Sequence, residues 1–225
     1  MPCSCFLRDG RNCIERVPIF SGLTSEEQME IAQITNERTF TRGELIFSAG
    51  DENHNLYVIH QGQVKLSRIS ESGKEQILRL VGPGDFIGEL AMFTKQPASA
   101  QAEALQDGIM CVINGERLKE LMVKYPQIAL KVVEELSSRL ERAEGMIESL
   151  ALHSVEQRIA QALLQYETDQ FELAMSKGDL AAALGMTQET LSRKLSAWQA
   201  EGIIKQTGQR QIEILDRSRL EELSE

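Results

Sequence analysis

The stretch LGMTQETLSRKLSAWQAEG, from Leu184 to Gly202, has the layout of a turn followed by an amphipathic helix. Gly185 can adopt the left-handed conformation that ends a preceding helix, and Thr187 can cap the helix that follows. One face of that helix repeats apolar residues with helical spacing and is expected to be buried: Leu191, Leu195 and Trp198. The stretch therefore predicts the second helix of a helix-turn-helix.

The opposite face of the same helix is polar near its N-terminal end, where a recognition helix meets the major groove of DNA. An arginine can bind O6 and N7 of guanine, a glutamate can accept a hydrogen bond from the cytosine amino group, and a serine can do either. We therefore predict a DNA-reading surface composed of Thr187, Gln188, Glu189, Ser192, Arg193 and Lys194.

The flanking segments complete this motif. SKGDLAAALG, Ser176–Gly185, predicts the first helix, with Ser176 and Asp179 in capping-box spacing. IIKQTGQRQIEIL, Ile203–Leu215, predicts a hairpin of the kind called a wing. From 177 to 210 there are five basic and three acidic residues, a balance of +2, although the whole chain carries −10. This charge distribution favours a small local DNA surface over broad attraction to nucleic acid.

Upstream, the pattern changes twice. From about Thr39 to Val112, short β-type runs alternate with glycine-containing turns, which predicts a β-roll or barrel. From Gly115 onward the pattern is helical. The expected fold is α+β, with a cysteine-bearing tail over residues 1–20, a β-roll sensor domain over 21–125, a long helix over 126–152 and a winged helix-turn-helix over 153–225.

The long helix carries a heptad pattern, with apolar residues spaced alternately by four and three: Ala129, Val133, Leu136, Leu140, Ala143, Ile147 and Leu150. Such a strict repeat is typical of a seam between two parallel helices, so we expect two copies of the chain to pair along it. The alternative is a helix that packs only on its own domain.

These features together resemble the cyclic-AMP receptor and anaerobic regulator (Crp/Fnr) superfamily over essentially the whole chain. The tract from Glu189 to Arg193 matches the E-T-[I/L]-S-R tract of the Fnr-like branch, and Cys13–Phe20 is similar to the opening of Fnr-like proteins from Gram-positive bacteria. The resemblance implies a homodimeric transcriptional regulator on a pseudo-palindromic DNA site, with RNA polymerase as a partner. It also implies half-sites akin to TTGA, although Gln188 departs from both branches.

The segment GPGDFIGELAMFTKQPASA resembles the phosphate-binding cassette of that superfamily. Gly88, Glu89 and Leu90 match the cassette, but Ala98, followed by Ser99, stands where cyclic-nucleotide binders place an arginine. The long helix has Ala143 and Glu144 where the cyclic-AMP receptor has a Thr-Ser pair. Because a buried phosphate needs a charge-assisted partner, cyclic AMP is not expected as the effector.

The four cysteines suggest a different effector. Cys111 aligns with the β-roll cysteine of oxygen-sensing Fnr proteins, and Cys3, Cys5 and Cys13 lie near the N-terminus as in that branch. Four thiolates can hold a [4Fe–4S] cluster, although the spacing of the three N-terminal cysteines departs from the family pattern. A disulfide switch between Cys111 and an N-terminal cysteine is the main alternative. The others are a buried structural thiol and a haem-based gas sensor, although His54, His60 and His153 are scattered and none sits in a ligand motif.

Several classes of protein are disfavoured. The sequence has no apolar run long enough to cross a bilayer and no apolar core of signal-peptide type, so we expect a cytoplasmic protein without a membrane partner. It also has no convincing nucleophile–base pair or metal-hydrolase motif, so we do not expect an enzyme. The rival to a DNA-binding regulator is a ligand-sensing module that acts through a protein partner.

Overall fold

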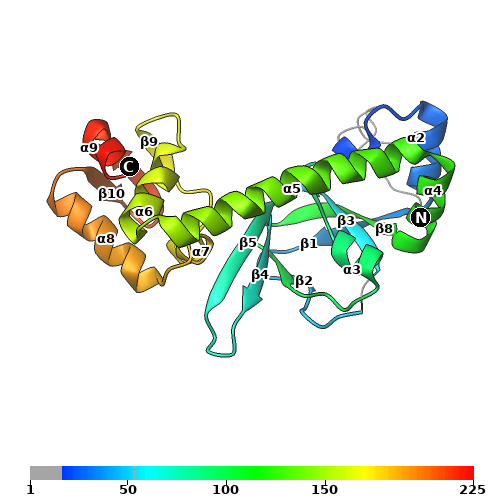
Figure 1. Ribbon diagram of the computed structural model, residues 1–225, viewed down its shortest axis with the longest axis horizontal. Helices are drawn as coiled ribbons and strands as arrows, with labels where there is room; N and C mark the ends of the chain where they lie inside the picture. The colour runs from blue at the N-terminus through cyan, green and yellow to red at the C-terminus, as the bar shows by residue number, and fades with distance from the viewer. Residues whose placement is uncertain (1–16, 53) are drawn as a thin grey trace. The chain divides into compact units, whose positions relative to one another are not determined.

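A computed structural model describes residues 17–52 and 54–225, and these residues form two compact units. The first contains residues 17–72 and 78–141, and the second contains 73–77 and 142–225. A mixed fold with a β-sheet domain, a long helix and a helix-turn-helix was predicted, and it is confirmed (Figure 1). No helix in the described ranges is both long and apolar enough to span a bilayer.

The first unit is built on two four-stranded antiparallel sheets. One has the strand order β1-β8-β3-β6 and the other has the order β2-β7-β4-β5. The strands are β1 (Thr35–Phe40), β2 (Leu45–Phe47), β3 (Asn55–Gln61), β4 (Val64–Ile69), β5 (Glu75–Val81), β6 (Phe86–Ile87), β7 (Gln101–Ala104) and β8 (Gly108–Asn114). The helices of this part of the chain are η2 (Pro18–Phe20), α2 (Ser25–Gln33), α3 (Glu89–Thr94) and α4 (Gly115–Lys124).

Helix α5 (Pro126–Leu152) begins at a proline, which is tolerated in the first turn of a helix. Its N-terminal part packs on the first unit, because Ile128 and Val132 are buried in the cluster that also contains Phe20, Leu56 and Cys111. Farther along, apolar side chains of α5 are exposed. This helix therefore belongs to the core of the first unit at one end only.

The second unit has its own core and a three-stranded sheet in the order β10-β11-β9. Its elements are α6 (Val155–Leu164), β9 (Gln170–Glu172), α7 (Lys177–Ala183), α8 (Gln188–Ala200), β10 (Ile204–Thr207), β11 (Gln211–Ile214) and α9 (Arg217–Glu222). Strands β10 and β11 are the predicted hairpin, and β9 adds to it a strand that the sequence analysis does not identify.

An ionic contact fixes α2 against the end of α4. Glu30 accepts hydrogen bonds from Lys124 Nζ at 2.7 Å and from Tyr125 OH at 2.8 Å. The hydrogen bond from Lys124, and then that from Tyr125, hold the pKa of Glu30 below its ordinary value of 4.5. The bond to Glu30 in turn raises the pKa of Lys124 to about 12.

This contact predicts a specific acid sensitivity. A carboxylate whose pKa is lowered by folding stabilises the folded state above its unfolded pKa, and that contribution is lost as pH falls through the folded value. Wild-type protein should therefore lose its stability advantage over Glu30→Gln as pH falls below about 4.5. Chemical denaturation at several pH values measures this difference, with Glu120→Gln, an exposed change on α4, as control. An advantage that does not vary with pH would contradict it.

Candidate functional site

The helix-turn-helix has the local geometry that its sequence predicts. Ser176 caps α7 by accepting a hydrogen bond from the Asp179 amide, and Gly185 in the intervening turn has φ of 70°. Thr187 caps α8 by accepting a bond from the Thr190 amide at 3.2 Å. The apolar stripe is buried as predicted: Leu191, Leu195 and Trp198. These contacts fix which face of α8 points outward.

The outward face of α8 presents the predicted polar residues to solvent. Gln188, Glu189 and Arg193 are exposed, and Ser192 is half-buried. Arg193 forms no ion pair with any described residue, so all five of its N–H donors are available to a ligand. Glu189 and Arg193 are four residues apart and hence lie on one side of the helix, where both can face a base edge together.

Three other basic residues in the helix-turn-helix and wing are already paired. Lys194 forms an ion pair with Glu156 of α6, Lys205 pairs with Glu213 across the wing, and Arg210 pairs with Glu172. Such pairing lowers the charge that each can offer to a phosphate. Among the predicted reading residues, the side chains of Lys194 and of the capping residue Thr187 therefore also have contacts within the fold.

The heptad residues of α5 divide into two groups. Ala129 and Leu136 are partly buried against the core of the first unit. Val133, Leu140 and Ile147 are 59%, 61% and 66% exposed, and Leu150 is 38% exposed. Ala143 is also exposed. An apolar stripe thus continues along α5 after the core contacts end.

The cassette residues line one cavity in the first unit, among them Gly88, Glu89, Leu90, Ala98 and Ser99. Gly88 permits the turn before α3, because its φ is 95° and a Cβ there would lie 2.3 Å from the carbonyl oxygen of Asn55. The cavity has a volume of about 40 Å³.

Three arginines that no motif in the sequence indicates contact two residues of this lining, Glu89 and Ser99. Arg139 of α5 donates to Glu89 Oε1 at 2.9 Å, and Arg79 of β5 lies 3.7 Å from the same oxygen. The Arg139 guanidinium also stacks on Phe86, 3.8 Å from the ring centroid, and bonds to Glu135 at 2.8 Å. At the other end, Arg68 donates to the backbone oxygen and to Oγ of Ser99. Arg68 is 31 residues from Ser99 in the sequence, and Arg139 is 50 residues from Glu89, so no local pattern indicates these contacts.

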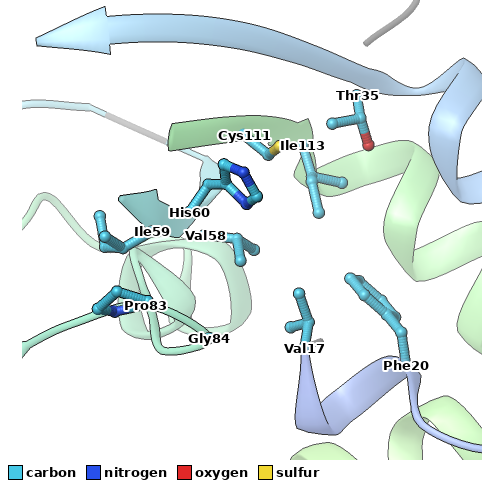
Figure 2. A pocket seen from close by; sticks show the side chains of 10 residues that line it. All are labelled: Val17, Phe20, Thr35, Val58, Ile59, His60, Pro83, Gly84, Cys111 and Ile113. Atoms are coloured by element: carbon cyan, nitrogen blue, oxygen red, sulfur yellow. The ribbon is translucent and has the colours of Figure 1, made fainter. Parts of the chain in front are cut away.

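A second cavity surrounds the one described cysteine (Figure 2). Cys111 of β8 is 5% exposed and lies opposite Val58 of β3 in the strand register. His60 lines the same cavity, and Val17 and Phe20 lie across it from Cys111. The cavity has a volume of about 90 Å³ and is otherwise largely apolar. The spacing of the histidines along the sequence does not predict that His60 shares a cavity with Cys111.

Of the four cysteines predicted to bind an iron–sulfur cluster, Cys111 is the one that lies among the described residues. Cys3, Cys5 and Cys13 lie outside the described residues, and a [4Fe–4S] cluster needs four ligands, of which Cys111 can supply one. Within the described ranges, no group of three or more metal-ligating side chains could hold a metal ion. Of the three histidines, His54 lies near the backbone oxygen of Ala91 and His60 lines the cavity around Cys111. His153 lies in the second unit.

Comparisons with known proteins agree with this architecture. The cyclic nucleotide-binding domain family matches residues 37–125, and the Crp-like helix-turn-helix domain family matches residues 157–223. The chain is 31% identical over 210 residues to the anaerobic regulatory protein of Aggregatibacter actinomycetemcomitans, covering 88% of this chain and 81% of that protein. It is 30% identical over 209 residues to the cyclic AMP receptor protein of Thermus thermophilus, covering 92% and 96%.

A solved structure is similar as well. FixK2 from Bradyrhizobium japonicum aligns with a TM-score of 0.72 and 26% identity, covering 85% of this chain and 98% of that chain. The two relatives have almost equal identity to this chain, yet one is an anaerobic regulator and the other is a cyclic AMP receptor. Overall similarity therefore does not identify the effector, and the side chains in the two cavities must be considered individually.

The buried pair between Arg139 and Glu89 gives a stability prediction. Their side chains are 9% and 8% exposed, so Arg139→Met leaves a carboxylate buried with only the more distant Arg79 nearby. We expect a loss of roughly 3 kcal/mol in the free energy of unfolding, measured by chemical denaturation. The Glu89→Gln/Arg139→Met double variant should lose less than the sum of the single changes. Arg117→Met, an exposed change on α4, is the control, and equal stability of the two methionine variants would contradict the prediction.

Proposed function

Since the chain belongs to the Crp/Fnr family of DNA-binding transcriptional regulators, we propose that two copies pair along α5 and read a pseudo-palindromic DNA site with their α8 helices. The observation that carries this proposal is the outward face of α8. It offers an unpaired arginine and a glutamate on a helix whose opposite face is buried. A DNA-binding role is favoured over action through a protein partner, because these side chains suit base edges.

Pairing along α5 is supported by its exposed apolar stripe. Large apolar side chains that line up on one face and remain exposed usually mark an interface. The heptad spacing lets the stripes of two parallel helices meet. In such a dimer the two recognition helices enter successive major grooves, so the half-site centres should lie about 34 Å apart.

Arg193 provides the direct test of base reading. Arg193→Ala should cost about 1–3 kcal/mol at the preferred site and relax the preference at one guanine, because a bidentate contact to O6 and N7 is lost. Mobility-shift assays on the preferred duplex and on single-base variants measure this. Lys205→Ala, on the wing, should instead weaken all sequences alike. Uniform weakening by Arg193→Ala would mean that Arg193 contacts phosphate and that the assignment is wrong.

For the effector, we propose that redox state acts through Cys111 together with the N-terminal cysteines. The cavity around Cys111 gives the thiol an opening within an otherwise buried core, and His60 supplies a polar neighbour. Two chemistries use this thiol. It can ligate a [4Fe–4S] cluster with Cys3, Cys5 and Cys13, or it can form a disulfide with one of them as the two thiols release two protons and two electrons to an oxidant.

Both chemistries require Cys111, which gives a common prediction. The DNA affinity of wild-type protein should change by roughly fivefold or more between reduced and oxidised samples, whereas Cys111→Ser should show the same affinity in both. Anaerobic purification followed by an absorption spectrum and iron and sulfide analysis separates the two chemistries. Redox-dependent binding that persists in Cys111→Ser would contradict the proposal.

The remaining parts of the proposal follow from a role at promoters. A regulator that binds promoter DNA acts where RNA polymerase acts, so we propose polymerase as a partner and the cytoplasm as the location. We also propose that the chain is a dimer in both redox states, because Ala143 places no charge in the α5 stripe to oppose pairing. The switch then changes the orientation of the reading helices.

A further inference from the structure

The positive balance that the sequence shows for the helix-turn-helix and wing is cancelled in the fold. Three of the five basic residues from 177 to 210 form ion pairs with glutamates that lie outside that range, on α6, β9 and β11: Lys194 with Glu156, Arg210 with Glu172 and Lys205 with Glu213. These three residues are the masking glutamates. The balance of +2 over residues 177–210 becomes −1 when their carboxylates are included. The surface therefore attracts DNA less than its own sequence indicates.

The other two basic residues of that range keep a charge that no carboxylate compensates. Lys177 donates to the side-chain oxygen of Gln206, a neutral group, at 2.7 Å. Arg193 is exposed, and neither Arg193 nor Lys177 forms an ion pair with a described residue. The masking glutamates thus divide the basic residues into two that are available to DNA and three that must first leave a carboxylate.

Each of the three ion pairs can exchange its carboxylate for a phosphate. Their side chains are between 29% and 61% exposed, so water and salt weaken the attraction and opening a pair costs little. A phosphate that takes the cation gains a charge-assisted hydrogen bond. It also approaches the glutamate that the cation has left, and the two negative charges repel each other. A masking glutamate therefore opposes DNA binding both by occupying a cation and by repelling phosphate.

Two of the masking glutamates are also held in place by contacts that do not involve their cations. Gln170 donates to Glu213 Oε1 at 2.8 Å, whereas Lys205 lies 3.4 Å from Oε2. Glu156 lies in the first turn of α6, where the helix dipole favours a negative charge. These carboxylates are thus expected to stay at the surface when DNA draws their cations away.

We propose that the masking glutamates, Glu156, Glu172 and Glu213, limit the affinity of this unit for DNA of every sequence by competing with phosphate for their cations. The effect is uniform because contacts to phosphate carry no sequence information directly. Discrimination between sequences is left to base contacts such as those of Arg193. The inference rests on the proposed function only in that this unit binds DNA, and it does not depend on dimer formation, base reading or cysteine chemistry.

A full-length variant in which all three masking glutamates are changed to glutamine tests this proposal. Fluorescence anisotropy with a labelled duplex that lacks an inverted repeat measures sequence-independent binding over a range of salt concentrations. We expect Glu156→Gln/Glu172→Gln/Glu213→Gln to bind roughly ten- to a hundredfold more tightly than wild type, or about two- to fivefold for each pair. The logarithm of its association constant should also fall more steeply with the logarithm of salt concentration, by about 0.9 for each additional phosphate contact.

A matched control removes the same charge from the same unit. Glu167, Glu201 and Glu225 are exposed and form no ion pair with a described residue, so changing all three to glutamine releases no cation. This control should keep the salt dependence of wild type. A second comparison concerns one pair alone. Lys205→Ala should weaken binding more in the Glu213→Gln background than in wild type, because the lysine is then free to contact phosphate. Melting temperatures establish that the variants are folded.

Three outcomes would overturn the proposal. The first is a triple variant that binds no more tightly than wild type or than the control variant. The second is weaker binding by the triple variant, which would mean that the glutamates orient their cations toward DNA. The third is an equal effect of Lys205→Ala in both backgrounds. If the wild-type protein bound no duplex at all, the proposed function would fail instead, so the two failures are distinguishable.

Discussion

Exposed apolar side chains along α5 are the constraint on which the functional account depends. Ile128 and Val132 anchor the start of this helix in the core of the first unit, but Val133, Leu140 and Ile147 have no such cover among the described residues. Burial of these side chains against a second copy is the solution that their heptad spacing favours. Pairing matters for function because a single α8 can read only half of a pseudo-palindromic site.

The first unit matches the cyclic nucleotide-binding domain family, and arginines approach the glutamate of its cassette. Glu89 remains at the cassette, yet Arg139 from α5 and Arg79 from β5 approach its carboxylate. The helix that carries the proposed dimer stripe thus also contributes a partner to Glu89, which lines the cavity. A ligand that changes the partners of Glu89 also changes a contact of α5. Occupancy of the cavity can shift a conformational equilibrium by this route.

Local signals explain which features were predictable. Thr187, Gly185 and the apolar stripe of α8 act within a few residues of one another, so the helix-turn-helix could be predicted and is confirmed. Strand β1 was missed as a strand because only its two ends are buried, which leaves TNERTF without an alternating pattern. The contacts of Arg68 and Arg139 join residues far apart in sequence, and so does the pairing of Lys194 with Glu156. Spacing along the chain cannot reveal such neighbours.

The central claim is that paired copies of α8 read one DNA duplex, and selection from a pool of random duplexes tests it most directly. Full-length protein, taken separately through reducing and oxidising conditions, should enrich an inverted repeat in at least one of them. The half-sites of that repeat should lie about one helical turn apart, centre to centre. Recovery of only an isolated half-site, or of no common sequence under either condition, would contradict the account.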